Sequence, residues 1–273
     1  MIIDFHTHVF PDKIAEKTVA MLHEKSGTVP SSDGTVNGLL KRMAEADADI
    51  CVTLPVMTSP TQFDSITRFA SELNERFCYE RRRIISFAGI HPACEDIDGK
   101  MRYIRSLGFL GVKIHPDYQV TFINDESYIR IFECAREYDL IVVTHSGVDA
   151  GFRDQPVRCT PERALDLITK VPHSKTVFAH LGASMMPDEV IDKLAGQDVY
   201  FDTAYCLKHT PPEKIKAIIA RHGADRILFA SDSPWSSIEG DIKIIRSLGL
   251  DKDTEDRIFY KNALSLLGIK GNL

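Results

Sequence analysis

The sequence predicts an α/β protein built as a single (β/α)₈ TIM barrel, and two observations support this. Eight short apolar runs rich in Val, Ile and Phe recur along the 273 residues, and amphipathic stretches separate them. Continuous apolar runs without polar alternation are typical of parallel strands buried on both faces. Eight strand–helix units fill roughly 250 residues in such barrels. We therefore expect one domain over residues 1–273, with allowance for local distortion of the barrel.

The predicted strands are spaced for parallel crossovers. From the fourth onward they start at residues 111, 141, 176, 199 and 227, which leaves room for one helix per unit. In chain order they cover Ile2–Phe5, Ile50–Leu54, Ile84–Ile90, Gly111–Ile114, Ile141–Thr144, Thr176–Ala179, Val199–Asp202 and Ile227–Ala230. An open doubly wound sheet is the alternative. It is disfavoured because His-Thr-His follows the first strand where that fold would carry a glycine fingerprint.

Helix signals occur between these runs. Asn124–Tyr138 carries an apolar stripe at helical spacing and acidic residues at its start. Thr160 followed by Pro161 predicts a helix N-cap and first turn. The Gly- and Ser-containing segment 26–38 predicts a loop that covers the barrel mouth.

Composition excludes several classes of function. The chain has 39 acidic and 33 basic side chains and a net charge of −6, so we expect no nucleic-acid partner. No apolar stretch approaches the roughly 20 residues of a membrane helix, and no secretory signal is recognisable. The six cysteines form no C-x-x-C pair, which indicates reduced thiols and a cytoplasmic protein.

Polar residues follow several of the predicted strands. His6 and His8 end the first, His145 the fifth and His180 the sixth, while Asp232 follows the eighth. In a barrel these strand ends meet on one face, where active sites of the fold lie. Imidazole and carboxylate ligands suit Zn²⁺ and other divalent ions. The sequence thus predicts a metal site, although any one of these histidines can instead be a core residue bonded to a backbone carbonyl. His23, His173 and His222 are interpreted as solvated or capping residues.

The ordered motifs H-T-H, G-V-K-I-H-P, T-H-S-G, A-H-L-G and S-D-S-P-W resemble those of the amidohydrolase superfamily, in its amidohydrolase-related (family 2) branch. The resemblance implies that His6, His8, His145 and Asp232 hold the catalytic metal. It also implies that His180 holds a second metal or acts on substrate and water. The expected cofactor is a divalent metal, Zn²⁺ first, with Mn²⁺ or Fe²⁺ as alternatives, at one or two ions per chain. The ending K-N-A-L-S-L-L-G also resembles the C-terminal helix of the family. Relatives of this kind often form homo-oligomers.

Other residues are candidates for the same site. In binuclear relatives a carboxylated lysine bridges two metals, and Lys113 stands in the matching region; the alternative is an ordinary ammonium, and a mononuclear site is narrowly favoured. The segment that follows the fourth strand supplies three candidates for substrate contact, which are His115, Tyr118 and Gln119. Arg153, after the fifth strand, and His209, after the seventh, are further substrate-binding candidates, although a solvated Arg153 balanced by Asp154 fits equally well.

The resemblance implies a hydrolase of amide, lactone or ester-like bonds in a small molecule. In that reaction Asp232 would ligate the metal and carry the proton, and His180 would stabilise the developing oxyanion. The main alternative is a non-oxidative decarboxylase of an unsaturated or aromatic carboxylic acid, which the same branch includes. A non-catalytic metal-binding barrel and a multi-histidine phosphoesterase are further alternatives that fit the ligand set less well.

Overall fold

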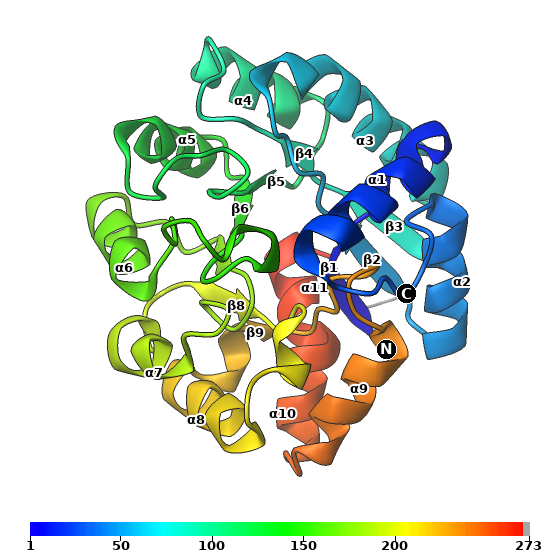
Figure 1. Cartoon of the computed structure of the whole chain (residues 1–273), viewed down its shortest axis with the longest axis vertical. Coiled ribbons are helices and arrows are strands. Elements are labelled where there is room, and N and C mark those ends of the chain that lie inside the picture. The colour runs from blue at the N-terminus through cyan, green and yellow to red at the C-terminus, as the bar shows by residue number, and fades with distance from the viewer. Residues whose placement is uncertain (270–273) are drawn as a thin grey trace.

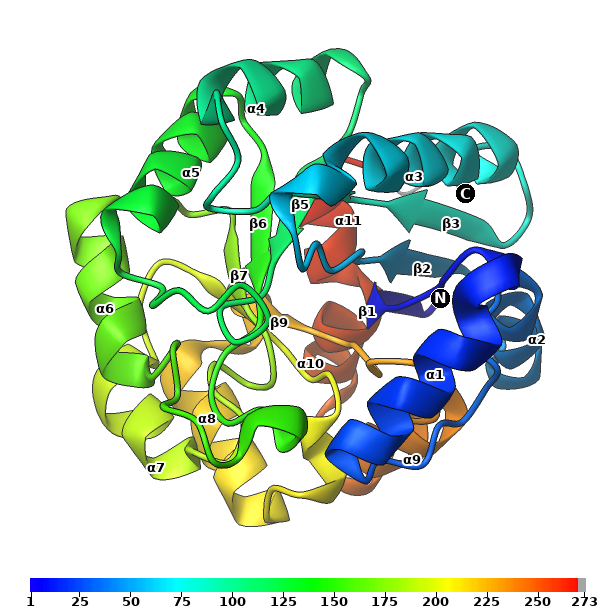
Figure 2. The ribbon, with the colours of Figure 1, turned by 45° about the horizontal axis from the view of Figure 1, so that its top comes forward.

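The computed structural model describes residues 1–269 and shows strands that alternate with helices around a common centre (Figures 1 and 2). The strands are β1 (Ile3–Thr7), β2 (Ile50–Thr53), β3 (Arg83–Ser86), β4 (Ala88–Gly89), β5 (Gly111–Ile114), β6 (Ile141–Thr144), β7 (Thr176–Phe178), β8 (Tyr200–Asp202) and β9 (Ile227–Leu228). Every pair of neighbouring strands is parallel. The prediction of an α/β barrel is confirmed.

Most of the helices form an outer ring around the strands, whereas the first and the last lie nearer the centre in this view (Figure 1). The helices are α1 (Asp12–Ser26), α2 (Val36–Ala46), α3 (Phe63–Phe77), α4 (Ile97–Ser106), α5 (Glu126–Glu137), α6 (Pro161–Lys170), α7 (Pro187–Glu189), α8 (Pro212–His222), α9 (Ile238–Ser247), α10 (Lys252–Asp256) and α11 (Asn262–Leu267). None of the helices within residues 1–269 is long and apolar enough to cross a bilayer.

The barrel is distorted at one predicted strand. The strands form two sheets, β1 to β3 and β4 to β9, and only Phe87 separates β3 from β4. The run Ile84–Ile90 therefore makes two short strands in place of one. The other two sheet edges are joined by backbone hydrogen bonds from Phe5 N to Phe229 O (2.9 Å) and from His8 N to Ser233 O (2.6 Å).

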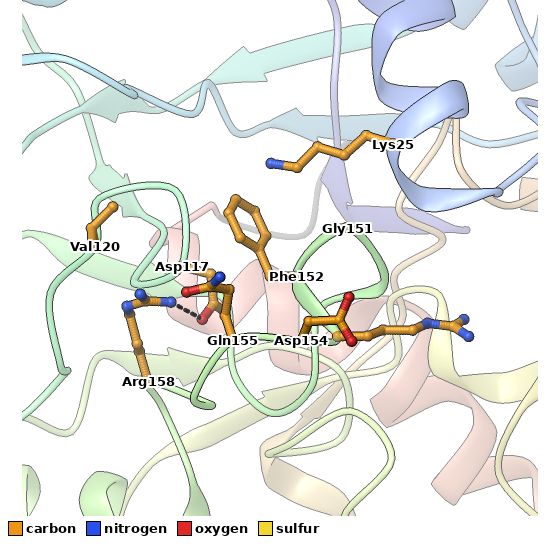
Figure 3. A pocket seen from close by; sticks show the side chains of 9 residues that line it. Lys25, Asp117, Val120, Gly151, Phe152, Asp154, Gln155 and Arg158 are labelled. Atoms are coloured by element: carbon orange, nitrogen blue, oxygen red, sulfur yellow. Dashed lines mark hydrogen bonds and ion pairs between the residues drawn. The ribbon is translucent and has the colours of Figure 1, made fainter.

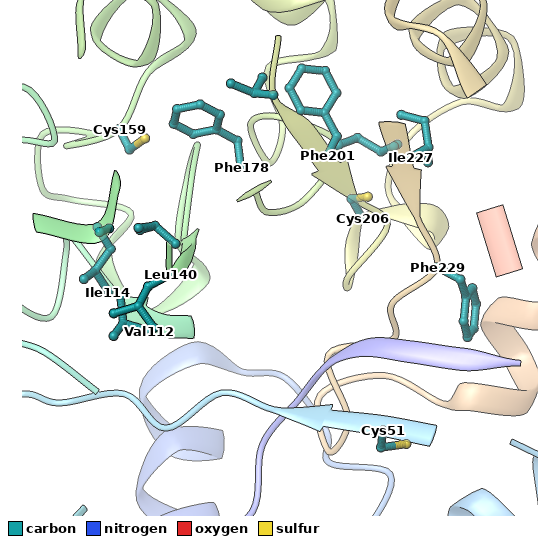
Figure 4. Close-up of a cluster of buried hydrophobic side chains, with 14 of the residues drawn as sticks. Cys51, Val112, Ile114, Leu140, Cys159, Phe178, Phe201, Cys206, Ile227 and Phe229 are labelled. Atoms are coloured by element: carbon teal, nitrogen blue, oxygen red, sulfur yellow. The ribbon is translucent and has the colours of Figure 1, made fainter. Parts of the chain in front are cut away.

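Two apolar layers hold the strands in place. Inside the barrel, residues such as Phe5, Val143 and Leu228 form a core against which α11 packs, as the predicted C-terminal helix should. Outside it, Val112, Ile114, Phe178, Phe201 and Ile227 belong to the layer between strands and helices (Figure 4). Burial of both strand faces explains why the runs read as continuously apolar.

The predicted helix starts are present. Thr160 Oγ1 accepts a hydrogen bond from Arg163 N (3.3 Å) at the start of α6, and Pro161 occupies the first helical position. The segment 26–38 forms an irregular stretch and then the start of α2 at Val36. Thr28 hydrogen-bonds Tyr205 (2.9 Å between hydroxyls), and Ser31 N donates to Pro234 O (2.6 Å). These bonds tie the segment to the loops after β8 and β9.

The interpretation of two histidines as solvated or capping is wrong. His173 and His222 are buried, and each donates from Nε2 to a backbone carbonyl, of Leu140 and Val199 respectively. His222 also stacks on Phe201 at 3.8 Å between ring centroids. The local sequence did not reveal this, because the carbonyls that the two rings meet belong to other segments of the chain. The six cysteines are unpaired, and all but Cys78 are buried.

Candidate metal centre

One cavity contains the ends of the strands that carry the predicted ligands. Its volume is about 500 Å³, and His6, His8, Lys113, His145, His180 and Asp232 all line it. His180 and Asp232 have backbone φ angles of 61° and 69°, in the left-handed region that residues other than glycine rarely adopt. Such backbone strain gathers at functional sites, where surrounding structure enforces it. Here it belongs to two of the predicted site residues.

Three acceptor atoms converge at this end of the cavity. His6 Nδ1 donates to Asp202 Oδ2 (2.9 Å) and His8 Nδ1 donates to Leu54 O (2.7 Å), so both Nε2 atoms carry a lone pair when the rings are neutral. These Nε2 atoms lie 3.4 and 3.0 Å from Asp232 Oδ1, which is also an acceptor. Acceptors this close require a shared cation or proton. The group therefore fits a divalent metal ion.

Burial keeps the relevant imidazoles neutral. The pKa of His6 lies well below its usual value, first because the ring is buried and then because Lys113 is close. Burial also lowers the pKa of His145 far below the usual value. Metal ligation needs the neutral imidazole, so no proton has to be displaced from these two rings at neutral pH.

His145 and His180 form a second pair of facing nitrogens. His180 Nδ1 donates to Ala204 O (2.8 Å), which leaves its Nε2 as a lone pair 2.9 Å from His145 Nδ1. On the far side of its ring, His145 Nε2 lies 3.7 Å from Asp117 Oδ2, and both atoms are buried without a hydrogen-bond partner among residues 1–269. His6, His8 and His180 thus each have one ring nitrogen hydrogen-bonded to a protein oxygen, which leaves the other nitrogen available to a ligand. That is the usual arrangement of histidines that bind metal.

His145 also belongs to a separate group with His115 and Asp149. Ligand atoms of these three residues lie within 4.8 Å of one another, as do those of His6, His8 and Asp232. The rings of His115 and His145 are stacked at 4.3 Å, and His115 Nε2 lies 3.3 Å from Asp149 Oδ2. His145 therefore belongs to the second group, and its ligation of the same ion as His6, His8 and Asp232 stays a prediction.

Lys113 is fully buried on β5 and faces the same centre. Its Nζ lies 3.0 Å from His6 Nε2, to which it can donate. Burial lowers the pKa of Lys113 to about 8, against the opposing effect of the Asp202 and Asp232 carboxylates. The amine is therefore less strongly protonated than that of a surface lysine. Carboxylation needs such a shift, because only the neutral amine reacts with carbon dioxide, whereas an ordinary ammonium does not.

The structure separates the substrate-binding candidates. His115 and Tyr118 line the cavity. Gln119 does not line it. Its side-chain Nε2 donates to Met57 O and Ile90 O, and its Oε1 accepts from His115 N and the Tyr128 hydroxyl, so no polar atom of the side chain is left for a substrate. Arg153 is exposed and lines a smaller, separate cavity. His209 is exposed and does not line the cavity. Its ring lies 4.9 Å from that of Tyr205, which does.

Sequence reasoning missed the carboxylates behind the histidines. Asp117 and Asp149 follow the fourth and fifth predicted strands, and Asp202 ends the seventh. Their position after strands was the available signal, since all such ends meet on one face. Which histidine each one would contact depends on side-chain direction across the barrel.

Comparisons with known proteins agree with this architecture. The family model Amidohydro_2, described as amidohydrolase, matches residues 3–269, which confirms the resemblance seen in the motifs. A putative amidohydrolase from Staphylococcus aureus is 19% identical with a TM-score of 0.71, covering 98% of this chain and 99% of that one. An uncharacterized TIM-barrel protein from Bordetella bronchiseptica is 16% identical with a TM-score of 0.77, covering 98% of each chain.

A third similar structure is a dihydroxybenzoic acid decarboxylase from Polaromonas sp. JS666 with bound manganese and the inhibitor 2-nitroresorcinol. It is 16% identical with a TM-score of 0.70 and covers 98% of this chain and 97% of that one. No curated protein matches the sequence. At these identities the solved structures establish the shared fold.

Proposed function

Because the chain belongs to the Amidohydro_2 family of amidohydrolases, we propose that it is a metal-dependent hydrolase that cleaves an amide, lactone or ester-like bond in a small molecule. One observation carries the proposal. Three acceptor atoms, His6 Nε2, His8 Nε2 and Asp232 Oδ1, converge in a cavity large enough for a small molecule. Enzyme activity of the amidohydrolase superfamily follows from the family; the reaction and the ion are the proposal.

The expected ligands are His6, His8, His145 and Asp232, with His180 next to them. Imidazole nitrogens and one carboxylate favour Zn²⁺, and Mn²⁺ or Fe²⁺ accept the same donors. Manganese in the similar decarboxylase supports that range. When bound, such an ion supplies a Lewis acid, which lowers the pKa of water toward about 7 and polarises a carbonyl group.

Asp232 is placed to move the proton. Its Oδ1 faces His6 and His8, which leaves Oδ2 to accept a proton from the attacking water and return it to the leaving group. The left-handed backbone of Asp232 and the hydrogen bond from its amide to His6 O (2.8 Å) hold the carboxylate at the end of the first strand. A fixed carboxylate loses little entropy when it acts.

His180 is better placed to accept than to donate. Its Nδ1 proton is committed to Ala204 O, so neutral His180 presents a lone pair at Nε2. This supports a role in binding the ion or in taking a proton from the nucleophile. Stabilisation of an oxyanion would need a second proton on the ring.

Decarboxylation of an unsaturated or aromatic acid is the second candidate. It is favoured because proteins of similar structure include a 2,6-dihydroxybenzoate decarboxylase and a 5-carboxyvanillate decarboxylase. The same residues would serve it, because the cation site and Lys113 would bind a carboxylate as readily as a carbonyl.

Metal analysis combined with a product screen tests the proposal. We expect about one divalent ion per chain in the wild type, loss of that ion in His8→Gln, and retention in the matched control His23→Gln, whose ring is exposed on α1. Lactones, amides, esters and aromatic acids are then screened for both hydrolysis and carbon dioxide release.

Metal-dependent hydrolysis that Asp232→Asn abolishes would support the proposal. Release of carbon dioxide would refute hydrolysis and support the second candidate, a decarboxylase. Tight metal binding with neither product, on a screen that covers both classes, would favour a non-catalytic barrel, and no uptake of zinc or manganese would refute a metal enzyme.

A further inference from the structure

The cavity that contains the candidate metal ligands has an apolar wall made by helix α1 and the residues just before it. This helix follows β1 and runs beside the short helix η2 (Ala150–Phe152), on the near side of the barrel in Figure 2. From the α1 side the cavity is lined by Val9, Phe10, Pro11, Ile14, Met21 and Leu22. Pro55 and Val56, after β2, and Ile66 and Phe69, on α3, also line it. Two segments of the chain thus supply its aliphatic and aromatic walls.

Charged groups are confined to the inner end. Among the described lining residues, Lys113, Asp149 and Asp232 are the only ones of the Asp, Glu, Lys and Arg types. Lys113 and Asp232 lie at the candidate metal site, and Asp149 is paired with His115. The other polar groups along the cavity carry no charge. They include the hydroxyls of Thr18 and Ser65, the amide of Gln62 and the indole of Trp235. No basic side chain is available there to neutralise a second anionic group.

The nearest other cations face elsewhere. Lys25 lies on α1, but its ammonium lies 3.4 Å from the centroid of the Phe152 ring and lines a separate cavity of about 350 Å³ (Figure 3). In that cavity Arg158 is paired with Asp117 at 3.4 Å (Figure 3). The ring of Tyr118 lies between this cluster and the larger cavity, since it lines the latter and has Lys25 4.6 Å from its centroid.

We propose that the substrate has an uncharged apolar body, an aryl ring or an alkyl or acyl chain, joined to a single polar reacting group. The reacting group lies against His6, His8 and Asp232, and the body lies between α1 and the residues from Pro55 to Phe69. The inference rests on the proposed metal-dependent activity for the position of the reacting group. Ile14 and Met21 are specificity-determining residues in this arrangement.

A small molecule is the occupant that the shape favours. The apolar walls are continuous with the ligand histidines in one cavity, so an occupant that covers them also reaches the reactive end. Ile14 and Met21 are 47% and 55% exposed, which leaves apolar surface for a ligand to cover. A second copy of the chain covering α1 is the competing occupant, and the test below distinguishes it.

The test measures binding of alkyl hydroxamates, from acetohydroxamate to octanohydroxamate, to the zinc-loaded protein by calorimetry. A hydroxamate binds the metal whichever reaction the enzyme catalyses. Affinity should rise by about three- to fourfold per methylene until the cavity is full, since each buried CH₂ contributes about that factor. A hydroxamate of equal length with a terminal carboxylate should bind at least about tenfold more weakly, because its charge is buried without a partner.

Two variants test whether the apolar wall on α1 causes the dependence of affinity on chain length. Met21→Glu should flatten the dependence of affinity on chain length. The matched control Leu107→Glu alters a 44% exposed apolar residue outside the cavity and should behave as the wild type. The uncharged fluorescent probe N-phenyl-1-naphthylamine should bind the metal-free protein and be weakened by Met21→Glu alone.

The outcomes separate the two proposals. If acetohydroxamate binds but chain length has no effect, or the carboxylate-ended compound binds as well, the apolar substrate is refuted and the metal-dependent function stands. If no metal binds yet the probe still occupies the cavity, the function fails and the apolar cavity is supported. If Met21→Glu dissociates a dimer and the probe does not bind, α1 is an interface between copies and the inference is overturned.

Discussion

His6 donates its Nδ1 proton to Oδ2 of Asp202 at 2.9 Å, and both side chains are buried. The other carboxylate oxygen of Asp202 accepts from the backbone amides of His180 (2.9 Å) and Ala204 (3.1 Å). One carboxylate therefore sets the tautomer of a candidate ligand on β1 and fixes the backbone that carries His180. It couples two strand ends that lie far apart in the chain.

Asp202→Asn should weaken binding of the divalent ion by about ten- to a hundredfold, because outer carboxylates orient ligand histidines and raise their basicity. Competition with a chelator measures the affinity. Asp198→Asn is the control, since Asp198 is exposed and pairs with Arg226 at the surface. Equal affinities in the two variants would mean that Asp202 has only a structural role.

Lys113→Met tests whether this lysine is a ligand. We expect the variant to bind one divalent ion on the order of tenfold more tightly than the wild type. In the wild type the Lys113 ammonium, 3.0 Å from His6 Nε2, repels the bound cation, and methionine removes that charge. Metal content is measured with and without bicarbonate. A second ion that appears with bicarbonate in the wild type and disappears in the variant would instead indicate a carboxylated Lys113.

Gln119→Leu should lower the free energy of unfolding by about 2–4 kcal/mol, since the carbonyls of Met57 and Ile90 would lose their buried donor. Denaturant titration measures the loss. Arg153→Ala should change stability by no more than about 0.5 kcal/mol, as expected for an exposed residue. A stable Gln119→Leu protein with impaired substrate binding would restore the role in substrate contact.

His222 should make stability depend on pH. Burial lowers its pKa to about 4 in the folded protein, and Nδ1 accepts from Gly196 N (3.1 Å), so a proton there finds no acceptor. The unfolded chain takes up this proton near pH 6.5, before the folded one does. The free energy of unfolding should therefore fall as pH drops from 6.5 to 4, by about 3 kcal/mol in total.

Comparison with His222→Gln isolates this contribution. Both proteins retain the other histidines, so the stability advantage of the wild type should shrink as pH is lowered through that window. Chemical denaturation at several pH values measures the difference. A difference that stays constant, or grows toward low pH, would contradict a neutral buried His222.

Local patterns in the sequence were sufficient for the order of elements and for the centre of the site. Buried parallel strands must be apolar on both faces, so the eight runs could be read directly, and Thr160 with Pro161 marked a helix start. The meeting of His6, His8 and Asp232 followed from the rule that strand ends of a barrel share one face. No side-chain detail was needed for these inferences.

Tertiary structure decided which partner each polar group has. Asp202 and His6 are separated by 196 positions, and Gln119 meets Met57 and Ile90 from different units of the barrel. Packing across the barrel satisfies the amide of Gln119 inside the protein, buries His222 and groups His145 with His115 and Asp149. Such contacts depend on side-chain directions in space, which the spacing of residues along a strand or helix does not specify.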